Sequence, residues 1–115
     1  STTTEAIKES VESILKSHNL SYEINWIQGG NPFLNTETTL IESVKNSITS
    51  IIDILPDQTT DGGTSDGRFV APTGAEVVEL GPVNDSIHKI DERVKIEDLT
   101  QLSEVYKNIL KSLLT

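Results

Sequence analysis

The sequence contains no cysteine, and its aromatic residues are limited to one tryptophan, two tyrosines and two phenylalanines. Without cysteine the chain can form no disulfide framework and perform no thiolate chemistry, which is compatible with a reducing cytosol, and we expect a cytoplasmic protein. With so few aromatic side chains, the core must consist mainly of isoleucine, leucine and valine. A length of 115 residues suits one domain of modest size.

Clustered positive charge is also missing. Nine lysines and arginines are scattered among eighteen acidic residues, and the formal net charge is −9. A surface that binds nucleic acid needs basic side chains concentrated on one face, so we expect no nucleic-acid partner. No apolar run approaches the ~18–20 residues of a membrane-spanning helix, so we expect no membrane partner either.

Hydrophobic periodicity predicts three helices, over residues 2–18, 36–55 and 96–114. The apolar stripe of residues 36–55 is broader than that of residues 2–18, so we expect the second helix to be more deeply buried. Thr2 and Glu5 have the spacing of a capping box at the start of the first helix. Pro56 is expected to end the second helix.

Three further segments are candidate strands. Residues 20–27 alternate between apolar and polar side chains, residues 76–80 (EVVEL) form a short apolar run, and residues 57–60 lead into a glycine-rich loop. This order of helices and strands predicts an α/β fold. The sharp break at residues 28–32 (QGGNP) is a candidate domain boundary.

Candidate chemistry is concentrated between residues 60 and 92. The turn GGTSDGR (residues 62–68) offers backbone N–H groups, two hydroxyls and a guanidinium, which suit an anionic ligand. The other interpretation is a surface loop in which Ser65 or Asp66 caps a short helix. His88 stands among acidic residues and could bind a metal ion, but one histidine does not make a metal site.

Two motifs together resemble a known family. GGTSDGR (residues 62–68) and GPVNDSIHKIDE (residues 81–92) resemble, at matching separation, the C-terminal part of the succinyl-diaminopimelate desuccinylase family. That family belongs to the dinuclear-zinc metallopeptidase and deacylase superfamily, which includes aminoacylase and acetylornithine deacetylase. The resemblance continues more loosely to the last helix, and NPFL (residues 31–34) fits the place where the family's lid domain returns to its catalytic domain.

The resemblance implies a three-layer-like α/β fragment of a zinc-exopeptidase-type catalytic domain. Residues 1–30 would be the helix and strand that end the lid, or dimerisation, domain, and residues 31–115 would be the C-terminal part of the catalytic domain. Because an edge strand and an apolar helix face would lack their usual neighbours, we expect a homodimer or a self-associated fragment.

The resemblance also implies a role for individual residues. His88 matches the family's last zinc ligand, in a site that holds two zinc ions in the complete enzyme. Gly63 and Thr64 match the turn that contacts the substrate, and Arg68 in the same motif is a candidate carboxylate contact. Asn84 matches the asparagine that precedes the zinc histidine, on the substrate side.

The implied substrate is a small molecule, N-succinyl-diaminopimelate, from which the complete enzyme would remove succinate in lysine and diaminopimelate biosynthesis. The family's His-x-Asp metal pair, its Glu-Glu pair and its remaining acidic ligands have no counterpart in these 115 residues. We therefore expect the chain to be a fragment that is inactive alone and contains no catalytic residue. The alternative is a stand-alone, non-catalytic module of the same fold that binds anions or associates with itself.

Overall fold

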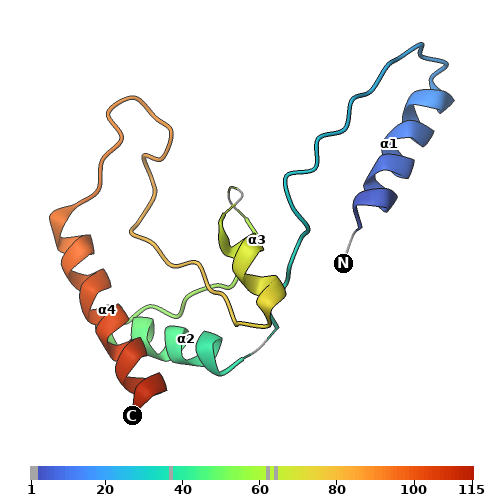
Figure 1. Cartoon of the computed structure of the whole chain (residues 1–115). Coiled ribbons are helices and arrows are strands. Elements are labelled where there is room, and N and C mark those ends of the chain that lie inside the picture. The colour runs from blue at the N-terminus through green and yellow to red at the C-terminus, as the bar shows by residue number, and fades with distance from the viewer. Residues whose placement is uncertain (1–2, 37, 62, 64) are drawn as a thin grey trace. The chain divides into compact units, whose positions relative to one another are not determined.

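The computed structural model describes residues 3–36, 38–61, 63 and 65–115. Within these ranges the elements are α1 (Thr4–Ser17), α2 (Thr39–Ile52), α3 (Gly67–Val70), the 3-10 turn η1 (Ala71–Thr73) and α4 (Ile96–Leu114) (Figure 1). Among the described residues, no helix combines the length and the apolar character needed to cross a membrane.

The chain divides into two compact units. The first comprises Ser1–Leu34 with Thr64–Ala75 and contains α1, α3 and η1, whereas the second comprises Asn35–Gly63 with Glu76–Thr115 and contains α2 and α4. The lid–catalytic boundary expected after residue 30 stays a prediction.

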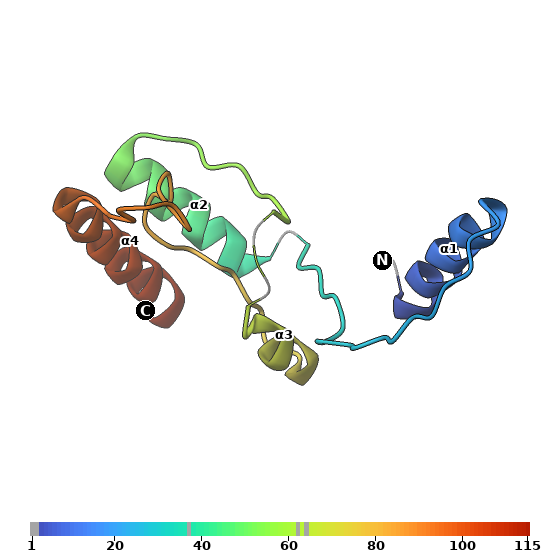
Figure 2. The same ribbon diagram turned by 90° about the horizontal axis from the view of Figure 1, so that it is seen from above.

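The predicted α/β architecture is wrong, because no strand forms among the described residues and the structure is helical. Residues 20–27, 57–60 and 76–80 follow irregular paths between helices, as the ribbon shows (Figures 1 and 2). A strand is stable only where a neighbouring strand accepts and donates its backbone hydrogen bonds, and the described part of the chain supplies no such neighbour. The three-layer arrangement expected for residues 31–115 is absent there for the same reason.

Helix α1 confirms the first predicted helix. The hydroxyl of Thr3 caps it by accepting a hydrogen bond from the N–H of Ala6 at 3.2 Å. Thr2, the expected capping residue, lies outside the described residues. The helix ends at Ser17, His18 follows as its C-cap, and Asn19 then adopts the left-handed conformation (φ 53°) that commonly follows a helix. No residue of α1 is buried.

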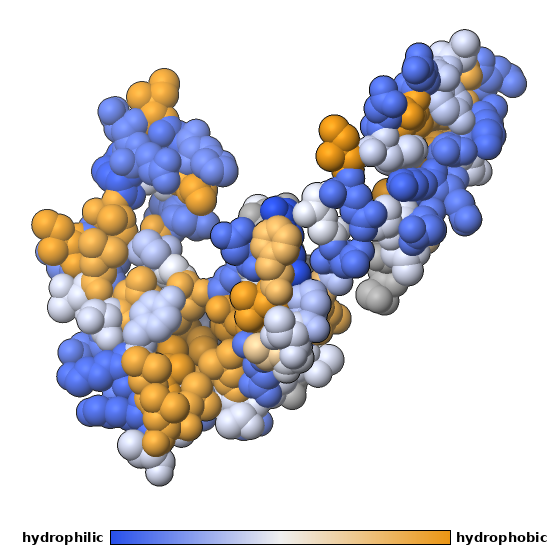
Figure 3. All heavy atoms as spheres, in the orientation of Figure 1, coloured by the Kyte–Doolittle hydropathy of each residue, from blue (hydrophilic) through white to orange (hydrophobic). Residues whose placement is uncertain are grey.

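Helices α2 and α4 pack against each other and form the core of the second unit. Val105 of α4 is fully buried, and Ile109 is 6% exposed. Their buried partners on α2 include Val44 and Ile48. The deeper burial predicted for the second helix relative to the first is therefore confirmed. Apolar side chains also remain visible on the surface of this pair (Figure 3).

Pro56 does not end α2, contrary to the prediction. The helix ends at Ile52, and Asp53 follows in the left-handed conformation with φ 59°. This residue turns the chain away from the helix axis three residues before the proline is reached, so the helical hydrogen-bond pattern is already interrupted there.

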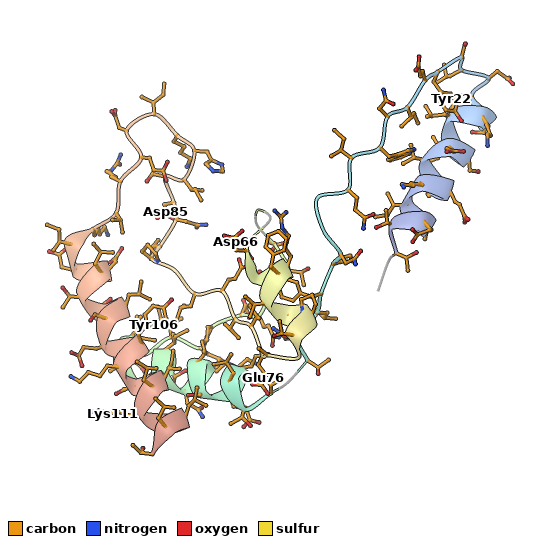
Figure 4. The ribbon with its side chains drawn as sticks, in the orientation of Figure 1. Tyr22, Asp66, Glu76, Asp85, Tyr106 and Lys111 are labelled. Carbon is orange, nitrogen blue, oxygen red and sulfur yellow. The ribbon has the colours of Figure 1, made fainter. Side chains whose placement is uncertain are left out.

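Residues 76–80 lie along the α2–α4 pair instead of joining a sheet. Val78 and Leu80 are partly buried against its core. The Tyr106 hydroxyl donates a hydrogen bond to the carbonyl of Leu80 at 2.5 Å, and the Glu76 carboxylate accepts one from the N–H of Leu40 at 3.1 Å (Figure 4). Because the first N–H groups of a helix have no partner within it, Glu76 also stabilises the start of α2.

Candidate functional site

His88 and Asn84 lie in one loop of the second unit, and Ser86 closes this loop. The Ser86 hydroxyl donates to the carbonyl of Arg93 at 2.7 Å and accepts from the N–H of Arg93 at 2.9 Å. Inside the loop, the N–H of Ile87 donates to the carbonyl of Asn84 at 2.9 Å. These local hydrogen bonds give residues 84–93 a defined backbone and hold Asn84 and His88 in the same turn.

The backbone of His88 is unusual, because its φ of 59° lies in the left-handed region. Few residues other than glycine adopt this conformation, although histidine, asparagine and aspartate do so more often than the rest. The side chains of His88 and Asn84 are both exposed. Both can therefore be reached by a ligand or by another part of a longer polypeptide.

The described residues do not by themselves form a metal site. Among them, no three histidine, cysteine or acidic side chains come together in a way that could hold a metal ion. His88 can supply one imidazole ligand, and its neighbours Asp85 and Asp91 do not complete a set. His88 alone therefore offers a single imidazole donor, which is fewer than the three or four protein ligands of a zinc site.

The glycine-rich turn leads directly into the short helix α3. The N–H of Gly67 donates to the Ser65 hydroxyl at 3.1 Å, and the N–H of Phe69 donates to the carbonyl of Asp66 at 2.9 Å. Of the two expected caps, Ser65 uses its side chain at the start of this helix, whereas Asp66 makes no capping bond with its side chain. Gly63 is exposed, and Thr64 lies outside the described residues.

Arg68 supplies the guanidinium group of this motif, and it belongs to the first unit. Its side chain is half-buried, and its Nε atom is buried without a hydrogen-bond partner among the described residues. The guanidinium carbon lies 4.7 Å from the centre of the Phe69 ring, within the range of a cation–π contact. The stem of the side chain runs beside Gly30.

Sequence reasoning missed this contact, because it treated the Gly-Gly pair of residues 28–32 only as a boundary signal. A glycine pair that is followed by Asn-Pro indicates a break, but it does not indicate which distant side chain approaches the backbone there. The roles expected for Gly63, Arg68, Asn84 and His88 stay predictions.

A second candidate region is a polar groove between α2 and α4, with a volume of about 310 Å³. Serine and asparagine side chains make up its lining: Ser43, Asn46, Ser47, Ser50, Asn108 and Ser112. None of these side chains titrates near neutral pH, so the groove offers no group for acid–base chemistry.

Comparison with known proteins shows which family the chain belongs to. The profile of peptidase family M20/M25/M40 matches residues 2–112, which is nearly the whole chain. The chain belongs to this family. The resemblance inferred from the GGTSDGR and GPVNDSIHKIDE motifs is therefore confirmed. Peptidase family M20/M25/M40 consists of hydrolases that generally depend on a metal ion.

Three relatives of this M20/M25/M40 chain are all named succinyl-diaminopimelate desuccinylase. The chain is 54% identical over 112 residues to the succinyl-diaminopimelate desuccinylase of Methylococcus capsulatus and 53% identical to that of Thioalkalivibrio sulfidiphilus. It is 51% identical to the succinyl-diaminopimelate desuccinylase of Marinobacter nauticus. Each alignment covers 97% of this chain but 30% of the relative, so the chain spans just under a third of the length of these proteins.

Proposed function

We propose that the chain is the C-terminal part of a zinc-dependent amide hydrolase that removes succinate from N-succinyl-diaminopimelate. The observation that carries this proposal is the 54% identity, over 97% of the chain, to an enzyme named for that substrate. The complete protein would work in the cytoplasm, in diaminopimelate and lysine biosynthesis.

Each site residue has a proposed task in the complete enzyme. His88 would hold one zinc ion through its exposed imidazole, and zinc, when bound, would act as a Lewis acid in amide hydrolysis. Asn84, in the same closed loop, would donate hydrogen bonds to the substrate from its side-chain amide. Gly63 and Thr64 would bring backbone N–H groups and a hydroxyl to the substrate, and Arg68 would pair with one of its carboxylates. These 115 residues supply no base for the water, so the chain alone would be inactive.

Substrate preference tests the proposal directly. The full-length protein is expected to hydrolyse N-succinyl-diaminopimelate with a kcat/KM roughly 100-fold above that for the N-acetyl analogue, because the acetyl group lacks the carboxylate that a guanidinium and N–H donors would bind. Initial rates measured by ninhydrin detection of the released amine give this ratio.

The 115-residue chain serves as the control in the same assay and is expected to release no succinate. A full-length protein that prefers the acetyl substrate would show that another acyl group is the natural one. A full-length protein that hydrolyses neither substrate would refute the proposal.

Self-association of the isolated chain is also part of the proposal. Large apolar side chains stay exposed on α4, including Leu99, Leu110 and Leu113, and Leu110 is 56% exposed. Exposed apolar side chains gathered on one helix favour association with a matching surface, and a second copy of the chain carries such a surface. The full-length enzyme would likewise be a homodimer.

Light scattering coupled to size-exclusion chromatography measures this association. The chain is expected to have a mass above the 12.6 kDa of a monomer. Replacing Leu110 and Leu113 by serine should shift it toward 12.6 kDa, whereas replacing Ser103 of the same helix by alanine should leave the mass unchanged. A wild-type chain that elutes only as a monomer would contradict the proposal.

A further inference from the structure

The Arg68 side chain lies so close to the backbone of Gly30 that any side chain at position 30 would displace it. A Cβ atom at Gly30 would lie 2.8 Å from Cδ of Arg68 and 3.6 Å from both Cγ and Nε. Carbon atoms do not approach to 2.8 Å without a displacement, because their van der Waals contact distance is about 3.5–4.0 Å. Both residues belong to the first unit, so the contact lies within one compact body.

Neighbouring Gly29 provides an internal comparison. A Cβ atom there would meet Nη1 of Arg68 at 3.6 Å, which is an ordinary contact. Neither glycine has φ in the left-handed region, so alanine can adopt the backbone conformation at both positions. Substitution at Gly30 therefore tests the space beside Arg68 and not the flexibility of the backbone.

The packing of Arg68 buries one of its donors without a partner. Its Nε is buried and has no hydrogen-bond partner among the described residues, while the Phe69 ring lies 4.7 Å from the guanidinium carbon. A buried charged donor without a partner is unfavourable, so binding of an acceptor to the guanidinium as a whole is favoured. Carboxylates fit a guanidinium because their two oxygens match its planar N–H groups.

We propose that Gly30 is a positioning residue, whose missing side chain allows Arg68 to lie against the backbone and so sets where its guanidinium meets a substrate carboxylate. The assignment of the carboxylate to the substrate rests on the proposed function. The contact between Gly30 and Arg68 does not. Residues 28–32, which link the segment after α1 to the rest of the chain, thereby help to position the Arg68 side chain.

Steady-state kinetics of the full-length enzyme test the proposal. In Gly30→Ala, Arg68 is pushed aside, and KM for N-succinyl-diaminopimelate is expected to rise roughly tenfold, as the loss of a hydrogen bond to a charged group predicts. The kcat value and the zinc content should stay close to those of the wild type, because a positioning contact for substrate binding does not touch the metal. Gly29→Ala is the matched control and should keep the wild-type KM.

A double-variant cycle separates positioning from a general structural effect. In an Arg68→Ala background, Gly30→Ala has no side chain left to displace, so it should not raise KM further. Equal effects of Gly30→Ala in both backgrounds, or no effect in either, would overturn the proposal. If Gly30→Ala does not fold, Arg68→Lys provides the second test. It keeps the charge but lacks the planar guanidinium that pairs with a carboxylate, so KM should rise, and a wild-type KM would overturn the proposal.

Chemical labelling supplies a result that does not depend on activity. An arginine-selective dicarbonyl reagent should modify Arg68 of the full-length protein severalfold faster in Gly30→Ala than in the wild type or in Gly29→Ala, as measured by peptide mass spectrometry. Equal rates would overturn the positioning role. Faster labelling in a protein that hydrolyses no succinyl amide would refute the proposed function while supporting the contact between Gly30 and Arg68.

Discussion

Replacing His88 by asparagine in the full-length protein is expected to lower its bound zinc and to reduce hydrolysis of N-succinyl-diaminopimelate by more than about 100-fold. Under the proposed function His88 is a direct metal ligand, and the loss of such a ligand should exceed the ~10–100-fold effects that follow from changes in residues that only orient ligands. Asparagine is the suitable replacement because, like histidine, it tolerates the left-handed backbone seen at His88 (φ 59°). Zinc analysis of the purified protein and initial rates measure the two effects.

His18 offers a matched control for this experiment. It is the other histidine of the chain and lies exposed at the C-terminal end of α1. His18→Asn should keep both zinc and activity. His88→Ala should lose zinc as well, and it should also destabilise the loop by about 1–2 kcal/mol, because alanine disfavours the left-handed conformation. Unchanged zinc and activity in His88→Asn would rule out His88 as a ligand.

Replacing Ile109 by alanine is expected to lower the free energy of unfolding of the α2–α4 unit by about 2–5 kcal/mol. Ile109 is 6% exposed and packs with Val44, Ile48 and Val105 in the core between the two helices. Alanine would leave a cavity there, and a loss of this size is a large fraction of the ~5–15 kcal/mol that stabilise a typical domain. Urea unfolding followed by far-ultraviolet circular dichroism measures the change.

Ile96 is the control, because it is an isoleucine of the same helix that is 78% exposed. Ile96→Ala removes the same atoms but opens no cavity, and alanine favours a helix slightly more than isoleucine does. Its effect should stay within about 0.5 kcal/mol. Equal losses at both positions would mean that the core between α2 and α4 does not contribute to stability.

The helices could be predicted from the sequence because their hydrogen bonds are local. The prediction of residues 96–114 matches α4 exactly, and Thr38 and Asp53 limit α2 to fewer residues than periodicity alone suggested. That residues 20–27, 57–60 and 76–80 form no strand in the described structure could not be predicted in the same way. Alternation in residues 20–27 records a preference for an extended chain, but a strand also needs a partner, and pairing depends on residues distant in the sequence.

For the candidate functional site, the sequence indicated individual residues but not the contacts between them. His88 and Asn84 could be named as candidates because a motif shared with a family identifies residue types at fixed spacing. The hydrogen bonds between the Ser86 hydroxyl and the Arg93 backbone that close their loop could not be found this way, because a serine side chain reaches the backbone of a residue seven positions away only in a particular backbone conformation. The contact of Gly30 with Arg68 was also unpredictable, because it joins positions far apart in the chain.

The closed loop of residues 84–93 also affects how strongly a metal could bind. Fixing the backbone of one residue lowers its conformational entropy by an amount equivalent to about 1–2 kcal/mol. In this loop, hydrogen bonds from Ser86 to Arg93 already restrict the backbone around His88 before any ligand arrives. A zinc ion bound by His88 would therefore order few additional residues, and preorganisation of this kind increases affinity without adding any contact to the ion.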